Sequence, residues 1–161
     1  MTYKSKRMLA ILVVNIALAV GYVIYALSAA APAEDNLQAW AIALLVLIGA
    51  CIVVVIIVQI VFNVAVSIGI TVKEANCDDK EAERLIESTM QDDEMDRLIM
   101  TKANNALLTA IGLGFVAALV VLAFGLPAVL SLHLFFGSAL IGELVAGVMN
   151  IYFYEAGVSH A

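Results

Sequence analysis

Charged residues and prolines are scarce in this sequence. Only 14% of its 161 residues are charged and only two are proline, so little keeps the chain in water and little interrupts a helix. Apolar residues make up 64% of the chain, which is more than one soluble core of this size buries. The scarcity of charge therefore argues against an ordinary water-soluble domain.

Basic residues, cysteines and catalytic motifs are also few or missing. The eight Lys and Arg residues and the net charge of −6 leave no basic stripe for a nucleic acid. Cys51 lies in an apolar run and Cys77 in a polar segment, without a C-x-x-C pair for redox chemistry. H-E-x-x-H, glycine-rich phosphate loops and paired intramembrane histidines are absent from the sequence. We therefore predict no enzyme activity, no cofactor and no nucleic-acid partner.

What the sequence has instead is long, continuously apolar runs. They approach or exceed the ~20 residues that cross a ~30 Å hydrocarbon layer as a helix, whereas barrel strands would alternate in polarity. We predict one all-α membrane domain over residues 1–161, with four transmembrane helices in two antiparallel hairpins at 8–28, 39–63, 103–126 and 130–154. The second run continues to residue 72, which is too long for the bilayer, so we expect a cytosolic extension.

The segment 73–102 between the second and third runs is polar and acidic. A pair of aspartates followed by Arg-Leu-Ile occurs twice in it, at Arg84 and at Arg97, and this pattern is typical of helix starts. We therefore predict a cytosolic helical segment that continues into the third transmembrane helix. Some of its acids are weak candidates for binding a divalent cation, although helix capping and solvation explain them without a metal. These acids are Asp92, Asp93, Glu94 and Asp96.

The basic residues all fall on one side of the predicted membrane. Lys4, Lys6 and Arg7 precede the first run and the others lie in 73–102, whereas the two remaining loops contain none. By the positive-inside rule, both termini and the acidic segment are cytosolic. The aromatic residues that then mark the outer interface are Tyr22, Tyr25 and Trp40.

Glu143 is the only carboxylate inside any of the four predicted spans. An acid at the centre of a membrane helix costs about 2.5 kcal/mol or more on insertion scales, so its side chain should face protein or a subunit interface. Asn15 and Thr109 fall at nearly the same depth and are the predicted hydrogen-bond partners. One interpretation is a protonated carboxyl with a structural hydrogen bond. The other is a site for a proton, a cation or a cationic substrate.

The fourth run carries two stripes at helical spacing. Asn150 lies on the same stripe as Glu143 and extends a polar intramembrane site toward the cytosol. Small residues favour close helix contact, either within the bundle or across a dimer. The small residues predicted to serve helix packing are Ser138, Gly142, Ala146 and Gly147.

The residues before the third run carry a resemblance. Asp92 to Ile99 is similar to the Asp-Glu-x-Asp-x-Leu-Ile motif of an uncharacterised family of small prokaryotic four-helix membrane proteins, with Met95 in place of the usual arginine. The basic cluster before the first run and the Tyr-x-Tyr-x-x-Gly ending at Gly157 fit the same family. The resemblance implies this topology in the plasma membrane of a bacterium or archaeon. It implies no catalytic or ligand-binding residue.

Together these features predict a non-enzymatic integral membrane protein in the lipid bilayer. Its protein partner is either a second copy of itself, in a homo-oligomer, or another membrane protein. In the second case the chain is an accessory or scaffold subunit of a membrane complex. The alternative is a small proton- or cation-coupled transporter that uses Glu143. Flux into liposomes that depends on Glu143 distinguishes the two.

Overall fold

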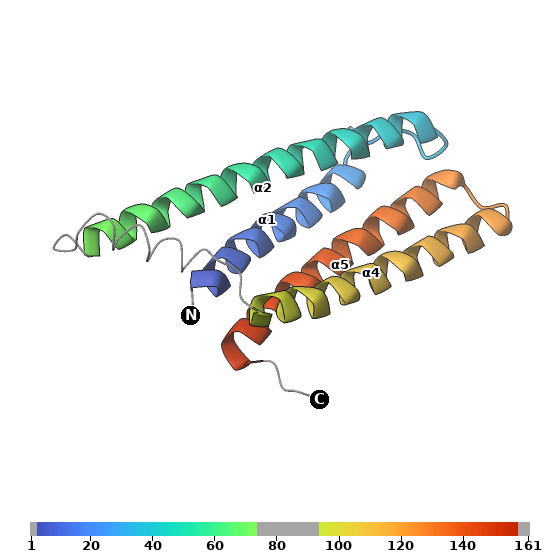
Figure 1. Cartoon of the computed structure of the whole chain (residues 1–161). Coiled ribbons are helices and arrows are strands. Elements are labelled where there is room, and N and C mark those ends of the chain that lie inside the picture. Colours follow the sequence, from blue (N-terminus) through green and yellow to red (C-terminus); the bar gives the residue numbers. More distant parts are fainter. Residues whose placement is uncertain (1–2, 74–93, 158–161) are drawn as a thin grey trace.

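The computed structural model describes residues 3–73 and 94–157. This part of the chain folds into four α-helices, which are α1 (Tyr3–Ala26), α2 (Leu37–Lys73), α4 (Glu94–Ala123) and α5 (Ala128–Ala156) (Figure 1). All four helices are long and apolar enough to cross a membrane, and the described ranges contain no strand. The prediction of an all-helical protein with four helices of membrane length is confirmed.

The helices differ from the apolar runs mainly in where they begin. α1 begins at Tyr3 rather than at residue 8, and α4 begins at Glu94 rather than at residue 103. Polar residues continue a helix beyond its apolar part, and the acids of the first turn of α4 stabilise its amino-terminal end. α2 continues to Lys73, as its long apolar run predicts. The acidic segment lies outside the described residues except for 94–102, which are helical.

α5 is the helix on which the other three pack. It lies closely along α4 and also contacts α1 and α2, while α1 contacts α2 (Figure 1). We call the end of the bundle with the connections 27–36 and 124–127 the loop end, and the opposite end the terminal end. The connection between α4 and α5 is tight because Gly125 adopts a positive φ of 71°, which glycine takes without strain.

The close packing of α4 on α5 depends on two glycines. A Cβ atom on Gly114 would lie 1.8 Å from Ser138 Oγ, so no side chain fits there. A Cβ atom on Gly142 would lie 2.8 Å from Leu107 Cδ1 on α4. The hydroxyl of Ser131 adds a hydrogen bond of 3.0 Å to the carbonyl oxygen of Ala118.

The predicted packing residues of the fourth helix therefore make contacts within the chain. Ser138 and Gly142 face α4, Gly147 lies against Leu12 of α1, and Ala146 is buried. The sequence left open whether these small residues pack inside the bundle or across a dimer. In the structure they bring α5 close to both α4 and α1.

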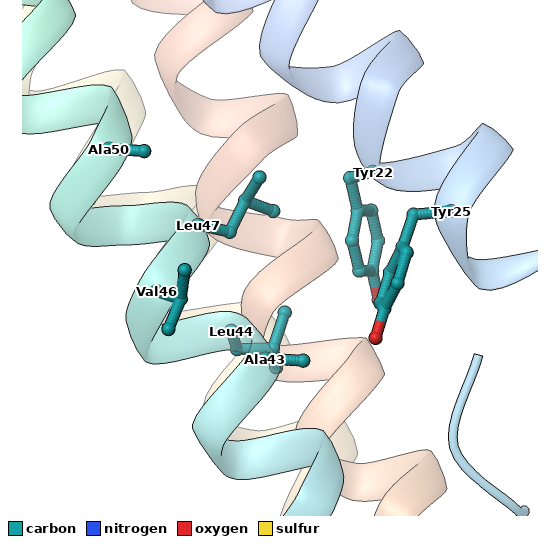
Figure 2. Close-up of a pocket in the computed structure, with 7 residues that line it drawn as sticks. All are labelled: Tyr22, Tyr25, Ala43, Leu44, Val46, Leu47 and Ala50. Atoms are coloured by element: carbon teal, nitrogen blue, oxygen red, sulfur yellow. The ribbon is translucent and has the colours of Figure 1, made fainter. Parts of the chain in front are cut away.

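α2 is packed more loosely than the other helices. Its closest packing is at the loop end, where Leu44 joins Tyr22 and Phe136 in a small buried cluster. Figure 2 shows Tyr22 and Tyr25 extending side by side from α1 beside a groove whose other wall is α2. This groove has a volume of about 340 Å³. The closest packing in the bundle is therefore that of α4 on α5, and α1 also lies against α5.

Candidate functional site

Glu143 lies on α5 in a groove between α5 and α2. The groove has a volume of about 560 Å³ and is almost entirely apolar, with walls that include Ile48 of α2 and Phe136 of α5. The Glu143 side chain is exposed on the single chain. Apart from this carboxyl group, the surface of the groove therefore suits contact with lipid tails or with another helix.

Asn15 of α1 reaches Glu143 across the bundle. Its Nδ2 atom donates a hydrogen bond of 3.5 Å to Glu143 Oε2, which is at the long limit for such a bond. Asn15 itself is buried. The structure thus brings together the two residues that the sequence placed at matching depth. One long hydrogen bond satisfies only part of the bonding capacity of a carboxyl group.

Thr109 lies at the same level as Glu143 but on another face. Gly142 packs against Leu107 and Ala110 of α4, which places Thr109 beside the same turn of α5. The Thr109 side chain is exposed, and its hydroxyl donates to the carbonyl oxygen of Asn105 at 2.8 Å. Within the described ranges α4 makes no helix contact with α2, whereas the groove of Glu143 lies on the α2 side. Thr109 therefore points away from the carboxyl group of its own chain.

Further polar side chains lie between Glu143 and the terminal end. Asn150 Oδ1 is buried and has no hydrogen-bond partner among the described residues. On the neighbouring helices, Arg7 Nη2 donates to Gln59 Oε1 at 3.5 Å, while Arg7 Nε is buried without a partner. These unsatisfied atoms are unusual in a folded protein, and each keeps hydrogen-bonding capacity that the described residues do not use.

The acids proposed as weak metal ligands have different surroundings. Asp96 is only 3% exposed and forms an ion pair with Lys4 Nζ of α1, whereas Glu94 is exposed. Asp92 and Asp93 lie outside the described residues. Among the residues described, no group of three or more His, Cys, Asp or Glu side chains could hold a metal ion.

The ion pair of Lys4 with Asp96 is a feature that sequence reasoning missed. We interpreted Lys4 as an orientation signal and Asp96 as a solvated or capping acid. The spacing of Asp96, Ile99 and Ala103 places all three on one helical face, and all three are buried. That spacing is the signal that could have shown Asp96 turned inward.

A second polar group, at the loop end, was also missed. The Tyr22 hydroxyl and His133 Nδ1 share a hydrogen bond at 2.5 Å, and the rings of Trp40 and His133 meet edge to face at 4.4 Å. These residues come from α1, α2 and α5 and are far apart in the sequence. The sequence indicated only that Tyr22 and Trp40 lie near the outer interface, because nothing in it pairs them with His133.

Comparisons with known proteins add no assignment. The chain matches no protein-family model, no curated protein and no solved structure. The resemblance around Asp92 to Ile99 stays a prediction.

Proposed function

We propose that this chain is a non-enzymatic integral membrane protein that works as a homo-oligomer, with a second copy of the chain covering Glu143. The observation that carries the proposal is the exposed carboxyl group in an apolar groove, held by one hydrogen bond of 3.5 Å to Asn15 within the described residues. An acid that faces lipid costs about 2.5 kcal/mol or more at the helix centre. A neighbouring helix in the groove removes that cost.

α4 of the second copy is the helix that fits this role. Parallel copies hold the same residues at the same depth in a bilayer, and Thr109 is exposed at the level of Glu143. Within its own chain the Thr109 hydroxyl donates to the carbonyl oxygen of Asn105, and a hydroxyl has further hydrogen-bonding capacity for a carboxyl group of the neighbouring copy. Such an interface joins two different surfaces, so repeating it forms a ring of subunits when the rotation between them closes.

Substitutions at Glu143 and Thr109 test this interface. We expect Glu143→Leu and Thr109→Val each to weaken self-association by about fivefold, the scale of one hydrogen bond between membrane helices. Glu143→Gln keeps the hydrogen bonding and should associate like the wild type. Native mass spectrometry in mild detergent measures the assembly in multiples of the 17.1 kDa chain.

Thr101→Val is the matched control for Thr109→Val. Thr101 is also exposed on α4 and also donates to a carbonyl oxygen four residues earlier, at 2.7 Å, but lies two turns closer to the terminal end. Equal effects of the two threonine substitutions would contradict the interface.

Two further results bear on the assembly itself. A monomer at all protein concentrations would contradict the homo-oligomer. A different protein that copurifies from native membranes would make the chain an accessory or scaffold subunit.

We further propose the orientation of the chain in the plasma membrane of a bacterium or archaeon. The helices form two antiparallel hairpins, α1 with α2 and α4 with α5, with the loop end outside and both termini and the acidic segment 73–102 in the cytosol. The support is the charge distribution, because every Lys and Arg lies before residue 8 or in the segment 73–102 of the sequence, and neither connection at the loop end contains one.

Cysteine labelling checks this orientation. In a chain with Cys51 and Cys77 changed to Ala, an impermeant thiol reagent added to whole cells should label Asn36→Cys, in the exposed loop end. Lys6→Cys, which is exposed at the terminal end, should react only after the membrane is permeabilised. Labelling of Lys6→Cys in intact cells would reverse the orientation.

The alternative function is a small transporter for protons or cations that uses Glu143. The observation in its favour is the set of incompletely bonded polar atoms on the terminal side of Glu143, including Asn150 Oδ1. Ion- or proton-dependent flux in liposomes that Glu143→Gln abolishes would establish this role. Wild-type liposomes without flux under every gradient tried would leave the assembly role.

A further inference from the structure

A further pocket lies at the loop end of the bundle and is distinct from the Glu143 groove and from the groove in Figure 2. It has a volume of about 400 Å³, which is within the range of small-ligand sites. Three helices and two connections enclose it. Its polar and aromatic walls are Tyr22 of α1, Trp40 of α2, His133 of α5 and Glu34 from the connection between α1 and α2.

The aromatic walls of this pocket are held in place. Trp40 is 4% exposed and its Nε1 atom donates to the carbonyl oxygen of Ala33 at 3.2 Å. His133 is held between two rings, since it bonds to the Tyr22 hydroxyl and meets the Trp40 ring edge to face. A site whose rings are already positioned loses little entropy when a ligand binds.

The charge around the pocket favours a cation. Glu34 is the one carboxylate in the lining. Every Lys and Arg of the chain lies before residue 8 or in the segment 73–102, so neither the lining nor the two connections contain a base. A negative carboxylate with no competing base attracts a positive ligand, and the electron-rich faces of Trp and Tyr rings do the same.

We propose that this pocket binds a small organic cation through a substituted ammonium group. Glu34 supplies the charge, and the rings of Trp40 and Tyr22 supply an aromatic wall beside it. His133 acts as a positioning residue that holds Tyr22. Val129 and Leu130 give the organic part of the ligand an apolar wall. The site does not depend on the assembly proposed for Glu143, because its lining comes from a single chain.

The ammonium group has two possible sources at this depth of the membrane. One is a water-soluble amine that reaches the loop end from the aqueous side. The other is the headgroup of an amine lipid such as phosphatidylethanolamine. Both present the same chemistry to Glu34 and the rings, so the source is assigned by experiment.

Trp40 makes the binding directly measurable, because it is the only tryptophan of the chain and lines the pocket. Choline added to the purified full chain in detergent should change the Trp40 emission and reach saturation. The probe 3,3-dimethylbutanol has the shape of choline without its charge, and we expect it to bind at least about tenfold more weakly. Sodium chloride at equal ionic strength controls for salt.

Glu34→Gln should weaken choline binding by about fivefold or more, while Asp35→Asn, its neighbour outside the lining, should leave it unchanged. His133→Ala should also weaken choline binding, because Tyr22 loses the group that holds it. Three results would each overturn the proposal. They are equal binding of choline and 3,3-dimethylbutanol, equal choline affinities of Glu34→Gln and wild type, and the lack of a saturable change in Trp40 emission.

Nanodiscs then identify the source of the ammonium group. Choline should bind as tightly in phosphatidylglycerol nanodiscs as in detergent. If added phosphatidylethanolamine raises the choline concentration needed for half-saturation, the natural ligand of this ammonium site is a lipid headgroup. If the choline affinity is the same in both lipids, the site serves a soluble amine.

Discussion

Lys4→Met should lower the free energy of unfolding by about 3 kcal/mol, because it removes the cation that pairs with a buried carboxylate. Asp96 is 3% exposed at the start of α4 and forms its ion pair with Lys4 at the start of α1. Within the described residues α1 and α4 make no close backbone contact, so side chains such as these join them. Thermal unfolding in detergent, followed by circular dichroism, measures the change.

Two further variants separate the ion pair from other effects of the substitution. Lys6→Met removes a base of the same cluster from an exposed position and should change the stability by less than about 0.5 kcal/mol. The double variant Lys4→Met with Asp96→Leu replaces both charges by apolar side chains and should recover most of the loss. If Lys4→Met and Lys6→Met are equally stable, the ion pair does not stabilise the bundle.

Gly114→Ala should lower the free energy of unfolding by about 2 kcal/mol, the usual scale for overpacking a filled interface. The added Cβ atom would lie 1.8 Å from Ser138 Oγ and 2.2 Å from Ser138 Cβ, so α4 and α5 must move apart. Because the Ser138 Cβ atom is fixed to the backbone, a change of side-chain rotamer does not relieve the overlap. The same unfolding experiment measures the loss.

Gly112→Ala is the control for this position, since it lies one half-turn earlier on α4 with no atom within 4 Å of an added Cβ. Alanine favours a helix over glycine, so Gly112→Ala should leave the stability unchanged or raise it by up to about 1 kcal/mol. Adding Ser138→Gly to Gly114→Ala should restore most of the stability. A Gly114→Ala protein as stable as Gly112→Ala would show that the helices are not in close contact here.

These two contacts bear on the function proposed for Glu143. The Gly114 contact holds α4 to α5, and the ion pair of Lys4 with Asp96 ties α1 to α4 at the terminal end. The hydrogen bond between Asn15 on α1 and Glu143 on α5 depends on the packing of these helices in the folded bundle. Self-association of Glu143 variants should therefore be compared at temperatures well below their unfolding.

The side-chain partners divide into those that local spacing predicts and those that it does not. Asn15 and Glu143 were matched because helical rise converts sequence position into membrane depth. Depth alone could not choose between Asn15 and Thr109, since that choice depends on how α1 and α4 are rotated about their axes. The bond between Tyr22 and His133 depends on the same rotation and on which helices are neighbours.

The sequence by itself determined that the described residues include four helices long enough to cross a membrane, because long apolar runs with few prolines satisfy their backbone hydrogen bonds only within helices in a bilayer. Only the tertiary structure decided which helices touch. It placed α5 against all three others, turned Asp96 inward to Lys4 and left Glu143 in an open groove. The physical reason is that lipid tails are as apolar as the side chains of these helices. Burial therefore provides little preference for one helix pairing over another, and the pairing is set by small residues and a few polar contacts distant in sequence.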